Sequence, residues 1–315
     1  KENIKDMVES VRQVFYEILN NTNWLGEETK RTALGKAFSM LENIAYPSEY
    51  LNDTKLEELY QELNIENLTY FRNLQNVLTF NLNYRISKLN KPVNKTDWVT
   101  NGQAAIINAF YYSTNNAIIL PAAILQRLLF SANRPNYLNL GAIGWIIGHE
   151  ISHGFDNFGR QFNKDGGLEN WWDNQTEKNF LNRSQCFVEQ YGNYTIKSVN
   201  QTINGKLTLP ENIADNGGLR AAYRAFIEWK NNNTKSIRLL PGLNFTSNQL
   251  FWLSGANMWC TKYLKENLEE VLLTNEHSPT SARVVLSFSN HEEFAKDFNC
   301  PTNSPMNPPD RCRVW

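Results

Sequence analysis

The sequence feature that most constrains how this chain can fold is the motif His-Glu-Ile-Ser-His at residues 149–153. An apolar run at residues 143–147 precedes it, and the whole stretch is compatible with a helix. On a helix, His149 and His153 project from one face about 6 Å apart, as two ligands of one tetrahedral Zn²⁺ require. The alternative is a surface helix that holds this pattern by chance, an event of roughly one in a hundred for such a chain. The motif therefore predicts a zinc site carried by a helix.

Carboxylates in and beyond the motif supply the other groups that a zinc hydrolase needs. Glu150 lies one residue further round the helix, so its carboxylate can reach a water at the open metal position and act as a general base. Glu211 and Asp215 are again four residues apart. On a helix, Glu211 can complete a His₂Glu site while Asp215 hydrogen-bonds the outer nitrogen of a ligand histidine. Asp156 is a second candidate for that partner, although a simple helix-end carboxylate is nearly as common an explanation.

Composition excludes several classes of protein. A chain of 315 residues with 41% hydrophobic residues can bury a large core, so disordered and low-complexity classes are excluded. The formal net charge is −1, which argues against binding to nucleic acid or an anionic membrane through bulk charge. The apolar stretches at 117–125 and 141–148 are far too short to span a bilayer. The sequence starts at Lys1 without a signal-peptide pattern, so we expect a mature piece or a fragment.

Two features predict an extracellular environment. Ten Asn-x-Ser/Thr sequons occur where chance predicts about five, although a chain that is merely rich in Asn is the alternative. The sequons begin at Asn20, Asn52, Asn67, Asn94, Asn174, Asn182, Asn193, Asn200, Asn232 and Asn244. Four cysteines, Cys186, Cys260, Cys300 and Cys312, lie too far apart for a zinc knuckle or a redox motif. We expect them to be halves of disulfides.

Helical periodicity dominates the rest of the chain. Helices are predicted over 1–20, 27–45, 51–90, 139–154, 174–191, 210–230 and 247–270, the last with Cys260 in its interior. Gly217 and Gly218 would each cost roughly 1 kcal/mol inside an isolated helix, so we expect a close approach of two helices there. Apolar, β-rich residues at 104–112 and 117–120 predict a strand pair. The predicted fold is mainly α with a small β element, divided near residue 70 into a helical segment (1–70) and a catalytic part (71–315).

At these residues the chain resembles the neprilysin family of zinc endopeptidases, which includes the endothelin-converting enzymes. The resemblance rests on residues 108–111, 149–156 and 211–218 and on the C-terminal Cys-Arg-Val-Trp. Asn-Trp at 23–24, Ala-Tyr-Pro at 45–47 and Phe-Asn-Lys-Asp-Gly at 162–166 extend it over essentially the whole chain. The family consists of type II membrane or secreted glycoproteins, about twice as long as this chain. They have a thermolysin-like catalytic domain and a helical lid around a chamber for peptides, so the chain is expected to hold the catalytic half with part of the lid.

The resemblance implies a role for each candidate residue. Zinc would be bound by His149, His153 and Glu211, with Glu150 as the base and with Asp215 and Asp156 orienting the ligands. The substrate would be held by Asn108, the backbone of Ala109 and Arg283, and the oxyanion would be stabilised by His277. Without the resemblance, Arg283 would be interpreted as a surface cation and His277 as a loop residue. Asn108 inside an apolar strand already indicates a function, because a buried amide needs partners.

The resemblance also implies how the cysteines are used. Cys186 would pair with Cys312, while Cys260 and Cys300 would bond to an N-terminal segment or second chain that this sequence does not contain. The chain departs from the family at residues 126–130, Gln-Arg-Leu-Leu-Phe, and at Trp145, where a smaller or unbranched apolar residue is usual. Either departure could change the pocket for the residue after the cut bond.

The expected function is zinc-dependent hydrolysis of oligopeptides on the amino side of hydrophobic residues, outside the cell. Peptides would then be the substrates, and one Zn²⁺ per chain the cofactor. The alternative is a truncated or non-catalytic glycoprotein of the same fold that acts as a binding module. The presence of Glu150 favours the enzyme.

Overall fold

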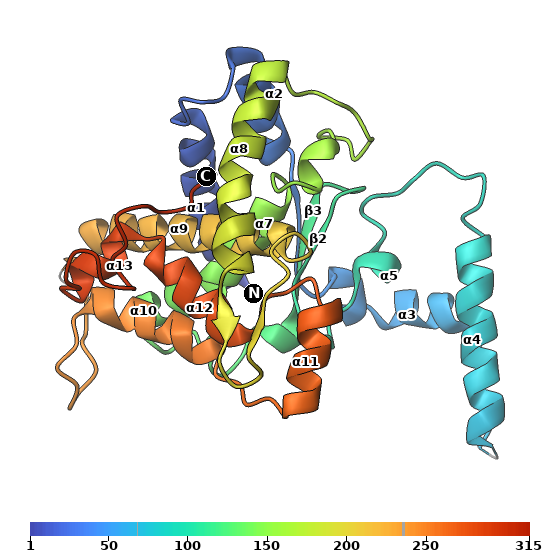
Figure 1. The fold of residues 1–315 in the computed structure, drawn as a ribbon. Coiled ribbons are helices and arrows are strands. Elements are labelled where there is room, and N and C mark those ends of the chain that lie inside the picture. Colours follow the sequence, from blue (N-terminus) through green and yellow to red (C-terminus); the bar gives the residue numbers. More distant parts are fainter. Residues whose placement is uncertain (68, 235–236) are drawn as a thin grey trace. The chain divides into compact units, whose positions relative to one another are not determined.

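The computed structural model of the chain describes residues 1–67, 69–234 and 237–315 (Figure 1). These residues form two compact units, a large unit of residues 1–45 and 105–315 and a small unit of residues 46–104. Every candidate catalytic, metal-binding or substrate-binding residue belongs to the large unit. The boundary that we predict near residue 70 falls inside the small unit, between two of its helices, and stays a prediction.

Helices make up most of both units. In the large unit they are α1 (Glu2–Asn20), α2 (Glu27–Phe38), α6 (Asn136–Asn139), α7 (Trp145–His153), α8 (Asn174–Gly192), α9 (Leu209–Asn232), α10 (Ser247–Met258), α11 (Lys265–Thr274), α12 (Thr280–Ser289) and α13 (Glu292–Asp297). In the small unit they are α3 (Asp53–Tyr60), α4 (Tyr70–Ile86) and α5 (Trp98–Asn101). The predicted class, mainly α with a small β element, is confirmed. Along the described residues, no helix combines the length and the apolar character that a membrane span needs.

The core of the large unit lies where α1, α7 and α9 pack together (Figure 1). α1 buries the apolar stripe that its spacing predicts, Ile4, Met7, Val8, Val11, Phe15, Ile18 and Leu19. α7 is buried along most of its length because α1 and α9 both cover it. A helix enclosed in this way holds its side chains in fixed positions, which suits a metal site.

The two helices that carry the site touch backbone to backbone at a pair of glycines. A Cβ atom on Gly148 of α7 would lie 2.4 Å from the carbonyl oxygen of Gly218 on α9. A Cβ atom on Gly218 would lie 2.2 Å from the backbone nitrogen of His149. Any larger residue would force the helices apart, so the predicted close approach at Gly218 is confirmed. This approach places the first turns of α9 beside His149.

A three-stranded sheet flanks the core, with the order β1-β3-β2. Its strands are β1 (Leu41–Ala45), β2 (Phe110–Tyr112) and β3 (Ala117–Pro121). β2 and β3 form the predicted antiparallel pair. β1 pairs with β3 in parallel, so the prediction of a helix as far as residue 45 is wrong beyond Phe38. Pairing with the buried β3 gives residues 41–45 hydrogen bonds that helical spacing alone could not reveal.

Other predicted elements differ in extent. The first predicted strand is extended only at 110–112, so Asn108 precedes β2 and is exposed, contrary to the expectation of a buried strand amide. The helix expected at 139–154 contains a π-helical stretch, Leu140–Gly144, before α7. The helix expected at 247–270 is divided into α10 and α11, so Cys260 lies past a helix end. The range 51–90 likewise holds two helices, α3 and α4.

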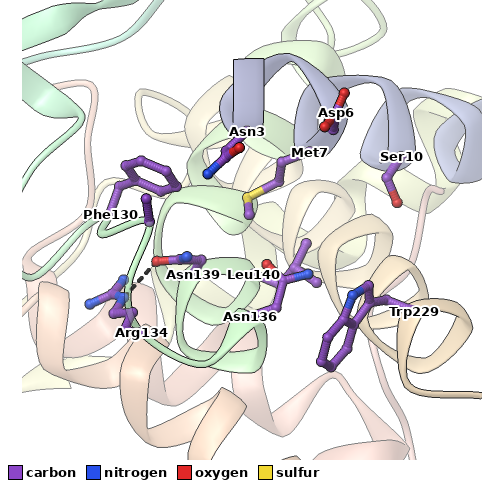
Figure 2. A pocket seen from close by; sticks show the side chains of 11 residues that line it. Asn3, Asp6, Met7, Ser10, Phe130, Arg134, Asn136, Asn139, Leu140 and Trp229 are labelled. Carbon is purple, nitrogen blue, oxygen red and sulfur yellow. Dashed lines mark hydrogen bonds between the residues drawn. The ribbon is translucent and has the colours of Figure 1, made fainter. Parts of the chain in front are cut away.

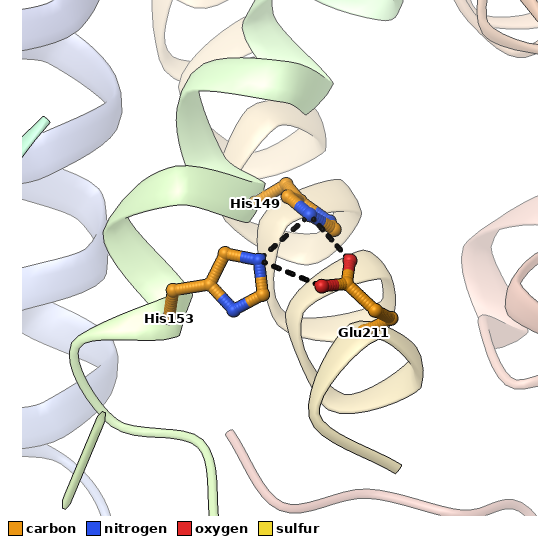
Figure 3. A group of neighbouring side chains, drawn as sticks. All are labelled: His149, His153 and Glu211. Carbon is orange, nitrogen blue, oxygen red and sulfur yellow. Dashed lines mark hydrogen bonds and ion pairs between the residues drawn. The ribbon is translucent and has the colours of Figure 1, made fainter. Parts of the chain in front are cut away.

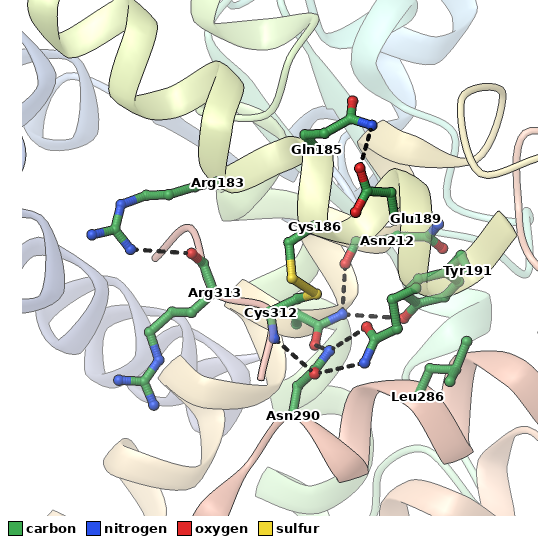
Figure 4. The surroundings of a disulfide bond; sticks show 12 residues. Arg183, Gln185, Cys186, Glu189, Tyr191, Asn212, Leu286, Asn290, Cys312 and Arg313 are labelled. Atoms are coloured by element: carbon green, nitrogen blue, oxygen red, sulfur yellow. Dashed lines mark hydrogen bonds between the residues drawn. A yellow bond between two sulfur atoms is a disulfide. The ribbon is translucent and has the colours of Figure 1, made fainter. Parts of the chain in front are cut away.

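A disulfide ties the C-terminus to the large unit. Cys186 on α8 is bonded to Cys312, the pair that the resemblance implies (Figure 4). The buried ring of Trp315 lies 6.0 Å from that of Phe155, centroid to centroid, so the tail packs against the residues that follow α7. The two other cysteines, Cys260 and Cys300, are not bonded to each other.

The asparagines of the ten sequons lie at the surface. Each of them is exposed. The buried asparagines lie outside every sequon and are Asn101, Asn116, Asn139, Asn212, Asn216 and Asn290. Because glycan attachment requires a surface asparagine, this distribution fits the predicted glycosylation.

His291 predicts how the stability of the large unit changes at acid pH. It is 4% exposed, and burial together with Arg220 and Arg313 lowers its pKa to about 3. The unfolded chain therefore binds a proton below pH about 6.5 that the folded chain takes up only near pH 3. Stability from this residue is complete above pH 6.5 and is lost as the pH falls toward 3, by on the order of 4 kcal/mol.

The measurement is the free energy of unfolding by urea at several pH values between 6.5 and 3. In His291→Gln the free energy of unfolding should depend less on pH, because glutamine takes up no proton. Equal slopes for the variant and the parent protein would show that His291 does not cause the acid sensitivity.

Candidate metal centre and active site

His149, His153 and Glu211 converge at one point between α7 and α9 (Figure 3). The two histidine Nε2 atoms lie 2.9 Å apart. Glu211 places Oε2 3.1 Å from Nε2 of His149 and Oε1 3.6 Å from Nε2 of His153. The histidines are one turn apart on α7, and Glu211 is in the first turn of α9, so helical geometry positions all three.

The outer nitrogen of each histidine meets a carboxylate. Nδ1 of His149 lies 2.9 Å from Oδ1 of Asp215, and Nδ1 of His153 lies 2.6 Å from Oδ2 of Asp156. An ionised carboxylate can only accept a hydrogen bond, so each Nδ1 carries the hydrogen. Each Nε2 then keeps its lone pair for an ion. Asp156 therefore contacts a histidine of the site, which a simple carboxylate at a helix end would not do.

The arrangement of these three groups fits a metal ion. Two Nε2 lone pairs and a carboxylate face one another at short distance, which is stable only with positive charge between them. Oε2 of Glu211 is buried but accepts no hydrogen bond of good geometry. Two imidazole nitrogens and one carboxylate form the ligand set of catalytic zinc sites, which leave a fourth position open. This donor set is compatible with zinc.

The charges around the site also favour a cation. Burial opposes protonation of His153, but Glu211 and Asp156 outweigh it and raise the pKa of this imidazole well above its usual value. Burial likewise opposes ionisation of Glu211, but the neighbouring histidines hold its pKa well below the usual range. A metal ion competes with protons for these atoms, so we expect metal affinity to fall in acid.

Glu150 lies between the two histidines on α7 and lines the cavity beside them. Its side chain is buried, and burial raises its pKa. His149 and His153 oppose this shift, while the Glu211 carboxylate adds to it. A raised pKa suits a carboxylate that must accept a proton and then release it.

Arg283 on α12 is buried, which excludes the surface-cation alternative. Its Nε donates to Oδ2 of Asp215 at 2.7 Å, and its Nη2 donates to Oδ1 at 2.6 Å. Burial opposes ionisation of Asp215, but Arg283 and His149 outweigh it and hold the pKa of this carboxyl below its usual value. One carboxylate thus orients both His149 and Arg283.

His277 lies in the loop before α12, at the mouth of the site. Its side chain is 42% exposed, and its Nε2 lies 3.0 Å from Oε2 of Glu211. The neighbouring Glu276 also borders the cavity, although no pattern in the sequence singles it out. The structure therefore brings His277 beside Glu211, at the wall of the cavity.

A cavity of about 680 Å³ opens in front of these groups. One wall is the segment from Asn108 to Ser113, which includes the edge strand β2. Apolar side chains of Ile124, Trp145 and Trp259 line another part. Trp259 is a residue that sequence reasoning missed, because a tryptophan beyond a helix end carries no periodic signal. Trp145 is fully buried and donates its Nε1–H to the backbone oxygen of Asp215 at 2.9 Å.

A second cavity, of about 430 Å³, lies between α1 and the residues around α6 (Figure 2). Asp6 and Arg134 are the ionisable residues on its wall. Arg134 is occupied by Asn139 and by backbone carbonyls, including that of Leu129. Neither of the groups of possible metal ligands found among the described residues borders this cavity.

Comparison with known proteins agrees with this geometry. The sequence profile of Peptidase family M13 matches residues 108–314, and a second profile of that family matches residues 1–47. The chain is 46% identical to Neprilysin-2 of Drosophila melanogaster, covering 100% of this chain and 41% of that protein. It is 44% identical to Neprilysin of Homo sapiens, covering 99% of this chain and 42% of that protein.

A solved structure shares the fold. The chain superimposes on the Mycobacterium tuberculosis zinc metalloprotease Zmp1, solved in complex with an inhibitor, with a TM-score of 0.89 and 28% identity. The match covers 100% of this chain and 47% of that one. The chain thus spans less than half the length of each of these three proteins.

Proposed function

The chain belongs to peptidase family M13, and on this basis we propose that it binds one Zn²⁺ and hydrolyses oligopeptides at internal bonds. The observation that carries the proposal is the convergence of His149, His153 and Glu211 beside Glu150, at the wall of a cavity. Membership of a peptidase family explains why these metal-binding side chains lie beside a carboxylate that can act as a base.

The ligands would be the three convergent groups, with Asp215 and Asp156 fixing the orientation of the imidazoles. Zinc bound there would supply Lewis-acid polarisation of the scissile carbonyl and would make water more acidic. Glu150 takes the proton from the attacking water and passes it to the leaving nitrogen. Its raised pKa helps the first transfer, because it lowers the free-energy cost of the protonated state.

The other residues of the cavity would act on the substrate. An extended peptide can pair with the edge strand β2, while Asn108 and the backbone of Ala109 hold its main chain. Arg283 would donate to the carbonyl next to the cut bond, since its contact with Asp215 presents it to the cavity. His277 would donate to the developing oxyanion.

The apolar wall supports a preference for a hydrophobic residue after the cut bond. Trp259 borders the cavity beside Arg283, and its ring packs against that of the fully buried Trp145, 5.8 Å away, centroid to centroid. Such a wall favours the burial of an apolar side chain. Cleavage on the amino side of hydrophobic residues follows from that preference.

An extracellular location is proposed from the disulfide and the ten exposed sequons. In this setting Cys260 and Cys300 would bond to a further segment or second chain, because neither has a disulfide partner here. The limited share of the relatives that the chain covers supports this assignment.

The test is zinc content together with chelator-sensitive hydrolysis of an internally quenched peptide. We expect one zinc per chain, loss of hydrolysis after chelation, recovery with zinc, and cleavage before an apolar residue. Zinc-loaded protein that leaves the peptide intact would instead support the binding module. Protein that takes up no zinc would contradict the proposed site itself.

A further inference from the structure

Lys36 on α2 is a buried cation that lies outside the proposed zinc site. Its side chain is 0% exposed. Its Nζ lies 2.7 Å from each of three backbone carbonyl oxygens, those of Gly154, Gly159 and Phe162. The three N–H groups of the ammonium thus meet three acceptors in the loop that follows α7.

We propose that Lys36 is a positioning residue for the zinc site. Its ammonium holds the loop at residues 154–162 in the shape in which Asp156 orients His153. The inference rests on the proposed zinc site. It adds Lys36 to the residues that position this site, although no sequence motif or residue spacing identifies Lys36.

The link from Lys36 to the site runs through Gly159. Gly159 gives its carbonyl to Lys36 and its N–H to Oδ1 of Asp156, the latter at 2.7 Å. Phe158 donates its N–H to the same oxygen at 2.7 Å, and Oδ2 of Asp156 meets Nδ1 of His153 at 2.6 Å. The loop therefore fixes the carboxylate, and Lys36 fixes the loop.

The loop also has no room to adjust at this point. A Cβ atom on Gly159 would lie 1.8 Å from the carbonyl oxygen of His153, so the loop passes directly against the end of α7. A change in loop shape must therefore alter the position of Asp156 relative to His153.

The Lys36 ammonium is enclosed on several sides, and its burial carries an energetic cost. Burial lowers its pKa to about 7, although Asp156 acts in the opposite direction. The rings of Phe155 and Trp171 lie 5.5 Å and 5.9 Å from Nζ, so the ammonium is enclosed on the other sides. If the ammonium is removed, three carbonyls in a buried region lose a donor, and the loop gains by turning them toward water.

The backbone of Lys36, unlike its side chain, is linked by hydrogen bonds to the edge strand β2 through Asn116. Its carbonyl accepts from Nδ2 of Asn116 at 3.0 Å, and Oδ1 of Asn116 accepts from the hydroxyl of Tyr111 on β2 at 2.9 Å. A side-chain substitution keeps this carbonyl. The edge strand, and with it the KM for peptides, should therefore change little.

The experiment measures the zinc dissociation constant of Lys36→Met by competition with a chelator, in protein shown to be folded by circular dichroism. We expect the constant to rise ~10–100-fold, the range for loss of a group that orients a ligand. Zinc-saturated variant should lose kcat with KM nearly unchanged. The matched control is Lys30→Met on the same helix, because among the described residues the Lys30 ammonium forms an ion pair only with the exposed Glu27, at 3.8 Å. It should leave the zinc affinity unchanged.

A double-mutant cycle tests the route through Asp156. If Lys36 acts through that carboxylate, Lys36→Met should weaken zinc binding little further in an Asp156→Asn background. Additive losses would overturn the proposal, because they would show independent effects. So would parental zinc affinity in Lys36→Met.

A second variant covers the case in which Lys36→Met does not fold. Lys36→Arg keeps the charge but cannot place one nitrogen against three carbonyls, so we expect weaker zinc binding by at least about threefold. Unchanged affinity in folded Lys36→Arg would then reject the role. Parent protein that binds no zinc would contradict the proposed function, whereas equal zinc binding by parent and Lys36 variants contradicts only this inference.

Discussion

Replacement of Glu150 by glutamine is expected to lower kcat by ~10²–10⁴ while zinc remains bound. Glutamine keeps the shape of the side chain but cannot accept a proton. The zinc ligands are His149, His153 and Glu211 in our proposal, so none of them is lost. The measurements are kcat on a quenched peptide and zinc content by elemental analysis of the same sample.

A control for this experiment is Glu276→Gln. Glu276 is an exposed carboxylate on the wall of the same cavity, so the substitution removes a comparable charge and leaves Glu150 in place. It should change kcat far less than Glu150→Gln does. Substantial activity of a zinc-replete Glu150→Gln protein would reject the general-base role.

Removal of a zinc ligand should have the largest effect on the metal. Glu211→Ala or His153→Ala leaves two protein ligands for the ion, so we expect loss of zinc on dialysis and loss of turnover. Asp215→Ala leaves all three ligands and should weaken binding by only ~10–100-fold. Zinc content after dialysis distinguishes the two classes.

Asp215→Ala should also affect the substrate side of the site, because Asp215 holds Arg283 through two hydrogen bonds. We therefore expect a rise in KM besides the weaker zinc binding. Full zinc occupancy in Glu211→Ala would mean that the third ligand lies elsewhere, which would contradict the proposed site.

The convergence of the proposed zinc ligands could be anticipated in part because much of their geometry is local. His149 and His153 are one helical turn apart, and so are Glu211 and Asp215, so each pair has its relative position as soon as its helix forms. The glycine pair at 217–218 even indicated that another helix would come close. The Cys186–Cys312 bond was available only through resemblance to a family.

Other features lay outside the reach of periodicity. Residues 41–45 continue a helical spacing, yet they form a strand because β3 offers them backbone hydrogen bonds. Asn108 looked like a buried strand residue, but the strand begins only at Phe110 and leaves it exposed at the cavity. In both cases pairing with β3, and not the local sequence preference, determined the structure.

By itself, the sequence determined the ligand types, their helical spacing and the mainly helical class, because these depend on residues a few positions apart. Only the tertiary structure decided that Asp215 meets His149, that Arg283 is buried against Asp215, and that Lys36 binds the loop after α7. The contacts His149–Asp215, Asp215–Arg283 and Lys36–Gly154 join residues that are 66, 68 and 118 positions apart in the chain. Such contacts form only when whole helices pack, and no local pattern encodes a distance of that kind.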